Sequence, residues 1–127
     1  MRREPREAAD VWLAGVRFSQ HVAHDGTLIS VLSARLALSP SLKSLARAAS
    51  QPSLDAAHRQ QIAAVVRAIP DAGFDWADAM RREADALAIA RRRNPNLKAG
   101  MPSQTRVNST ADEVRAERKA VLDTVTK

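Results

Sequence analysis

Apolar residues recur through residues 5–93 with the spacing of amphipathic helices. In the stretch 5–24, a rotation of about 100° per residue gathers apolar side chains on one broad face and charged side chains opposite it. No stretch alternates apolar and polar residues over the length of a strand. The pattern predicts an all-α protein, a small bundle of about four to five helices. It is interrupted at four residues that break helices: Gly26, Pro40, Pro52 and Pro70.

Turn and capping residues indicate where the first helices begin and end. The first helix begins near Pro5, which suits a first helical turn, and ends near His24. Asp25 and Gly26 then supply a turn. Thr27 is expected to cap the second helix, because its hydroxyl can accept a hydrogen bond from a free backbone N–H.

The segment Leu28–Leu38 is apolar nearly all round, so we expect it to be the most buried helix. Ser39 and Pro40 are expected to end or kink it, ahead of a short helix through Ala49. Leu32 lies in the middle of the apolar segment and is predicted to belong to the core.

Two further helices are expected before the apolar pattern stops at Asn94. One covers Leu54–Ile69 and is closed by Pro70, and the other ends with the arginines at 91–93. The predicted core face of the latter helix consists of Trp76, Ala77, Met80, Ala84, Leu87 and Ala88.

Residues 94–127 have a different character. Residues 94–109 mix Pro, Gly, Asn, Ser and Lys as a linker does, and the spacing of Thr110 and Glu113 is that of a capping box for a last helix to about Val125. The apolar stripe of this helix is thin. We therefore expect residues 1–93 to form a complete helical bundle domain, and residues 94–127 to form a basic linker and a C-terminal helix or arm outside it.

Composition narrows the chemistry. The 127 residues suffice for one domain, and they contain no cysteine, which excludes disulfides, thiolate catalysis and cysteine-ligated metal centres. The net charge of +6 is uneven: residues 1–40 hold five basic and four acidic residues, residues 41–80 four and four, and residues 81–127 eleven and six. The excess positive charge therefore lies toward the C-terminal end.

A basic cluster is the strongest candidate site in the sequence. Arg81 and Arg82 have Asp78 and Asp85 at helical spacing and are expected to be neutralised in part. The unbalanced positive charge farther along the chain is a candidate site for phosphate or an acidic partner, although the end of a solvated helix gives the same pattern. It consists of Arg91, Arg92, Arg93, Lys98 and Arg106.

Motifs for catalysis and metal binding are weak. His21 and His24 lie three residues apart and are weak candidates for a metal site that would need further ligands, such as His58 or a carboxylate. The chain has no Gly-x-Ser-x-Gly turn and no glycine-rich phosphate loop. The pattern therefore predicts no catalytic residue, no metal and no cofactor.

One stretch of the chain resembles bacterial proteins of unknown activity. The residues that carry the resemblance are Gln20 through Ile29, the Ile69 and Pro70 break, and Met80 through Glu83. The resemblance covers about residues 10–90 and points to an alanine- and arginine-rich helical domain. Proteins of this kind are often exported or tethered to a membrane. The resemblance implies a fold class and identifies no functional residues.

These observations predict a non-enzymatic protein-protein interaction or scaffold module that associates through residues 94–127 with another protein or with a second copy of itself. The alternative is a nucleic-acid-binding protein that uses the basic cluster. No apolar stretch is suited to span a membrane, and no signal sequence is evident. A cytoplasmic location is expected if the chain is complete, and a periplasmic or exported one if it is a fragment.

Overall fold

The computed structural model describes residues 5–98 and 100–126. These residues form five α-helices and one short 3-10 helix, and no strand occurs among them. Helices, the short 3-10 helix included, account for 79% of the described residues, so the all-α prediction is confirmed. The elements are α1 (Pro5–Val22), η1 (Ala23–Asp25), α2 (Leu28–Ala49), α3 (Ala56–Ala68), α4 (Trp76–Arg93) and α5 (Gln104–Val125).

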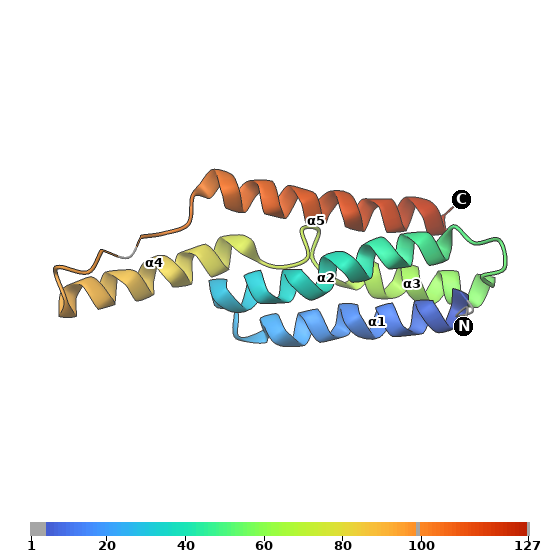
Figure 1. Cartoon of the computed structure of the whole chain (residues 1–127), viewed down its shortest axis with the longest axis horizontal. Helices are drawn as coiled ribbons and strands as arrows, with labels where there is room; N and C mark the ends of the chain where they lie inside the picture. The colour runs from blue at the N-terminus through green and yellow to red at the C-terminus, as the bar shows by residue number, and fades with distance from the viewer. Residues whose placement is uncertain (1–4, 99, 127) are drawn as a thin grey trace.

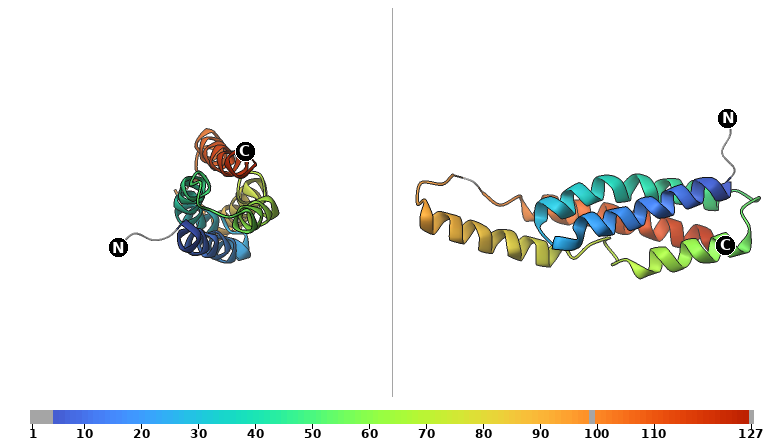
Figure 2. Two further views of the ribbon diagram at one scale, coloured as in Figure 1. Left: turned by 90° about the vertical axis from the view of Figure 1, so that its right-hand side faces the viewer. Right: turned by 90° about the horizontal axis from the view of Figure 1, so that it is seen from below.

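Four of the helices form a bundle. Contacts of α1 with α2, α2 with α5, α5 with α3 and α3 with α1 close a ring, which is visible end-on in Figure 2. α1 and α2 form an antiparallel hairpin in this ring. α4 contacts α2 near its start and then runs out beyond the bundle, and the chain returns along it before α5 begins (Figure 1).

Side-chain caps begin the helices where the sequence places them. The Thr27 hydroxyl accepts a hydrogen bond of 3.3 Å from the Ser30 backbone N–H, which confirms it as the cap of α2. The preceding Gly26 has a φ of 72°, a left-handed conformation that suits glycine in the turn. Asp55 and Asp75 cap α3 and α4 in the same way.

Pro40 does not end α2, and the expectation of two separate helices on either side of it is wrong. α2 continues from Leu28 to Ala49 with Pro40 inside it and exposed to solvent. A proline costs the helix one hydrogen bond. Leu38, Leu42 and Leu45 are all fully buried on both sides of this position, so a continuous core face outweighs that loss.

α1 and α2 pack closely because a glycine lies between them. A Cβ atom at Gly15 would clash with the Ser41 hydroxyl oxygen, so a larger residue there would require Ser41 or the helices to shift. Ser41 is buried and donates a hydrogen bond of 2.8 Å to the Ala37 carbonyl, four residues earlier in α2.

α2 contributes more buried residues than any other helix, but it is not buried all round. Leu32 is 38% exposed, so its prediction as a core residue is wrong. Ile29 and Leu36 are still more exposed, at 74% and 70%. A helix in a bundle has neighbours on part of its circumference only, and these three side chains lie on the outer side of α2. Trp76, by contrast, is 7% exposed and lies in the core as predicted.

α5 belongs to the core, which corrects the expectation that residues 94–127 lie outside a bundle completed by residues 1–93. The helix begins at Gln104, capped by Ser103, and not at Thr110. Its buried residues are Val107, Ala111, Val114 and Val121.

Polar contacts fix α5 against the rest of the bundle. The Ser39 hydroxyl donates a hydrogen bond of 3.0 Å to Glu117, and Arg118 donates one of 3.1 Å to the Val66 carbonyl. The short Arg35–Glu113 ion pair also joins α2 to α5, four residues before Ser39 and Glu117 in each helix. These partners lie far from α5 in the sequence, so periodicity alone did not indicate them.

Leu42→Ala and Leu36→Ala form a matched pair on α2. Leu42 is fully buried, so its truncation is expected to lower the free energy of unfolding by about 2–5 kcal/mol. Leu36 is 70% exposed, so its truncation is expected to cost less than about 1 kcal/mol. Urea titration followed by circular dichroism measures both. Equal losses would contradict the orientation of α2.

A chain that ends at Asn94 is expected to lose cooperative unfolding. Val114 and Val121 are fully buried, and burial of such side chains stabilises a fold by about 1.5–3 kcal/mol each, a large part of the about 5–15 kcal/mol typical of a domain. A thermal melt followed by circular dichroism measures the effect. A sharp transition near that of the full chain would show that residues 1–93 fold alone.

Candidate interaction surface on helix α4

The start of α4, from Trp76 through Met80, is anchored in the bundle. The Trp76 indole N–H donates a hydrogen bond of 2.8 Å to the Ala72 carbonyl, and its ring meets Phe74 edge-on with centroids 5.8 Å apart. Trp76 and Ala79 are the buried residues of this helix. The remaining residues 81–93, here called the α4 projection, extend past the ring of four helices (Figure 1).

The middle of the α4 projection is apolar without being buried. Residues 84–90 read Ala-Asp-Ala-Leu-Ala-Ile-Ala, so six of the seven are apolar, and none of them is buried. A helix that is apolar all round is normally covered on all sides. Ala84, Leu87 and Ala88 were predicted to face the core, and the structure places all three outside it.

The segment after α4 covers one side of the α4 projection. The Leu97 backbone N–H donates a hydrogen bond of 3.0 Å to the Asn94 carbonyl, which turns the chain back on itself. Leu97 then borders a shallow hollow of about 490 Å³ with Ala86, Ile89 and Ala90. Ile89 is still 50% exposed, so this cover is partial. Ala84 and Ala88 do not line the hollow and are exposed.

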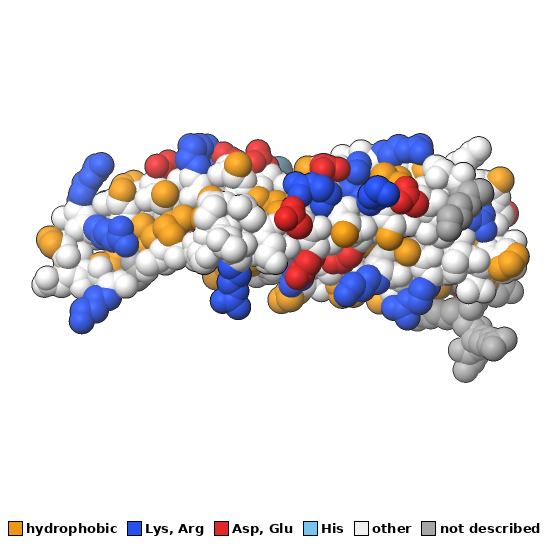
Figure 3. Space-filling model, turned by 90° about the horizontal axis from the view of Figure 1, so that it is seen from above, with side chains coloured by type: hydrophobic (Ala, Val, Ile, Leu, Met, Phe, Trp, Pro, Cys, Tyr) orange, Lys and Arg blue, Asp and Glu red, His pale blue; other side chains and the backbone are white. Residues whose placement is uncertain are grey.

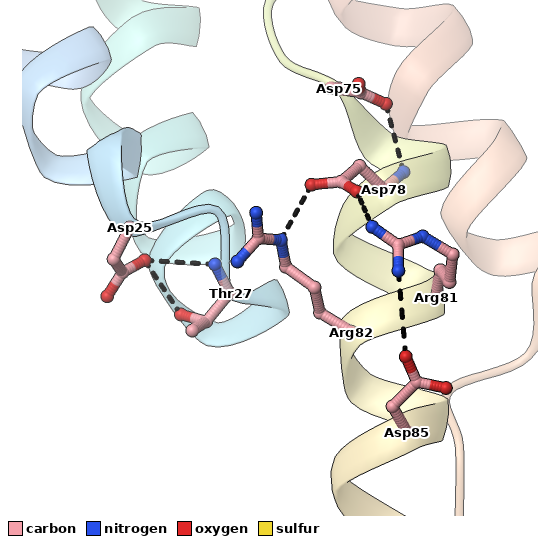
Figure 4. A network of polar contacts seen from close by, with 7 residues as sticks. All are labelled: Asp25, Thr27, Asp75, Asp78, Arg81, Arg82 and Asp85. Atoms are coloured by element: carbon pink, nitrogen blue, oxygen red, sulfur yellow. Dashed lines mark hydrogen bonds and ion pairs between the residues drawn. The ribbon is translucent and has the colours of Figure 1, made fainter.

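Carboxylates gather at the base of the α4 projection (Figure 4). Asp78 accepts a hydrogen bond of 2.7 Å from Arg82 and another from Arg81. These two arginines, Arg82 first, hold the pKa of the Asp78 carboxyl below its ordinary value. Arg81 also lies 3.7 Å from Asp85.

The loop between α1 and α2 adds a further carboxylate there. Asp25 accepts a hydrogen bond of 3.0 Å from the Thr27 backbone N–H, which is the main reason that its pKa lies below the ordinary value. With Asp75, Asp78 and Asp85, the group drawn in Figure 4 has four carboxylates and two guanidinium groups. The base of the α4 projection therefore carries a net negative charge.

Arginines form the free end of the α4 projection, and three of the five predicted cluster residues meet there. Arg91, Arg92 and Arg93 occupy the last turn, where cations are favoured by the helix dipole. Arg92 and Arg93 make no ion pair with any other residue that the structure describes. Lys98 follows Leu97 in the returning segment and is exposed.

The fifth residue of the predicted cluster lies elsewhere. Arg106 is in the first turn of α5, which begins over the bundle and away from the free end of α4 (Figure 1). It borders a groove of about 1000 Å³ between α2 and α5 that also contains Leu32, Leu36 and Val107. The sequence therefore predicts one basic cluster, whereas the structure separates Arg106 on α5 from the basic residues at the end of α4.

His58 lies on a different helix from His21 and His24. His21 ends α1, His24 lies in η1, and both are exposed. His58 lies at the start of α3, with its Nδ1 2.9 Å from Asp55 and its Nε2 3.6 Å from Asp10. Among residues 5–98 and 100–126, no three His, Cys, Asp or Glu side chains are grouped as a metal site would require.

Comparisons with known proteins identify no relative: the chain matches no protein-family model, no curated protein and no solved structure. The resemblance to bacterial helical proteins stays a prediction. Within the part of the chain that the structure describes, no helix combines the length and the apolar character of a membrane span.

Proposed function

We propose that this protein is a non-enzymatic protein-protein interaction module and that the α4 projection is its contact element. The observation that carries the proposal is the sequence at 84–90, six of whose seven residues are apolar while none is buried. The contact region therefore lies in the second half of α4, ahead of the residues 94–127 that the sequence favoured.

The energetics of a lone helix support this proposal. Residues 81–93 are thirteen of the 18 residues of α4, and an isolated helix shorter than about 12–15 residues is only marginally stable in water. Alanine favours the helical state, but it contributes little burial. Ile89 is 50% exposed, so covering the rest of its side chain would stabilise a complex by about 1 kcal/mol. A partner that covers the α4 projection would therefore also stabilise its helix.

A protein partner suits this surface better than nucleic acid. The arginine tip is next to an apolar segment, and its helix begins in a net negative group of side chains. On the face shown in Figure 3, basic side chains alternate with acidic ones over the bundle, and hydrophobic side chains are exposed over α4 and the segment that follows it. A continuous basic surface, which favours nucleic acid, is not seen on that face.

Photo-crosslinking from Ala88 tests the proposal. A benzoylphenylalanine residue in place of Ala88 is expected to form a protein adduct on illumination of the native cells, because the side chain is exposed on the α4 projection. The same residue in place of Ala120 is the matched control, since Ala120 is an exposed helical alanine on α5. Gel mobility and mass spectrometry identify the adduct.

Each result of this experiment has a definite meaning. A protein adduct from position 88 and none from position 120 supports the proposed function. No adduct from position 88, or equal adducts from both positions, contradicts it. An adduct with nucleic acid from position 88 favours the alternative function.

A further inference from the structure

We propose that the partner of the α4 projection is a second copy of this chain, packed antiparallel against it across a two-fold axis near Ala88. This inference rests on the proposed function and names its partner. An isologous pair requires a surface that is complementary to itself, so that each contact occurs twice. The charges and the open side of α4 meet this requirement.

The charges of α4 are self-complementary along its length. Residues 75–85 carry four carboxylates and two guanidinium groups, and residues 86–93 carry three guanidinium groups and no carboxylate. In an antiparallel pair with its two-fold axis near Ala88, residues 84–93 of the two helices overlap, and the arginines at the end of each helix come next to Asp85 of the other. A parallel pair would place the three arginines of one copy against those of the other, so charge favours the antiparallel arrangement.

One ion pair defines the register. Asp85 and Arg92 are seven residues apart, two helical turns, so both lie on the same side of α4 about 10 Å from each other along the axis. Their midpoint falls between Ala88 and Ile89. A two-fold axis near Ala88 therefore brings Asp85 of each copy opposite Arg92 of the other. Arg92 makes no ion pair with a described residue of its own chain, so it is available for this contact.

The open side of α4 fits a second helix. Ala84 and Ala88 lie within a narrow arc next to the line of Asp85 and Arg92, and both are exposed. Small side chains allow two helix backbones to approach closely. The hollow bordered by Leu97 is formed by Ala86, Ile89 and Ala90, so the returning segment leaves this alanine side uncovered.

The mass of the full chain in solution tests the pairing. Light scattering coupled to size-exclusion chromatography is expected to give twice the 13.8 kDa mass of one chain, with dissociation on dilution. Ala88→Arg is expected to yield the single-chain mass, because it places a long cation on the two-fold axis. Ala120→Arg, on the exposed side of α5, is the control and is expected to leave the pair intact.

Charge reversal tests the antiparallel register. Asp85→Arg and Arg92→Asp are each expected to weaken the dimer by about tenfold or more, because two attractive contacts become repulsive. The double variant is expected to restore the affinity to within about threefold of the unmodified chain. Asp123→Arg is the control, since Asp123 pairs with Lys119 four residues away on α5 as Asp85 pairs with Arg81.

The outcomes separate this inference from the proposed function. A single-chain mass at every concentration overturns self-association, and an adduct of Ala88 with a different protein would then leave the proposed function intact. A dimer that persists in Ala88→Arg, or that single charge reversals leave unchanged, overturns the antiparallel α4 pair. A dimer that is weakened by each reversal and restored by both supports it.

Discussion

A ring of four helices around one core is the constraint on which the rest of this structure depends. α5 closes the ring against α2 and α3, with Val114 and Val121 fully buried, so no position in the ring is left for α4. α4 lies between α3 and α5 in the chain and must therefore leave the bundle and return. The connection from Asn94 to Ser103 is long because it spans this return. The exposed apolar helix is thus a consequence of how the core is closed.

A helix outside its own core needs another source of stability. Trp76 anchors the start of α4, and Leu97 covers one side of its second half, but no residue from 81 to 93 is buried. Antiparallel pairing would cover the remaining side with the same helix of another chain and would place opposite charges together. The surface ion pairs would set direction more than affinity, because exposed pairs contribute only about 0–1 kcal/mol each. Affinity would come from burial of the apolar middle.

Local signals in the sequence were sufficient to predict the fold class. They were not sufficient to predict which helix faces are buried in the core and which are exposed. The Thr27 cap and the burial of Trp76 followed from spacing and helix-capping chemistry. Pro40 predicts a break because the cost of a proline is local, while the leucines that offset this cost act through tertiary packing. Periodicity predicts a core face that includes Ala84, Leu87 and Ala88, because it indicates which residues share a face and does not indicate what covers that face. Sequence proximity groups Arg106 with Arg91, Arg92 and Arg93. The chain turns back between them, so residues that are close in sequence lie apart in the structure.

Amide hydrogen exchange of residues 84–93 as a function of protein concentration tests the central claim most directly. The claim is that this half of α4 obtains its stability from another copy. Exchange in residues 84–93 is predicted to be slow at concentrations where the dimer forms and fast after dilution, while amides around Leu42 in the core of α2 exchange slowly at both. Exchange in residues 84–93 that is equally slow, or equally fast, at all concentrations would contradict the account.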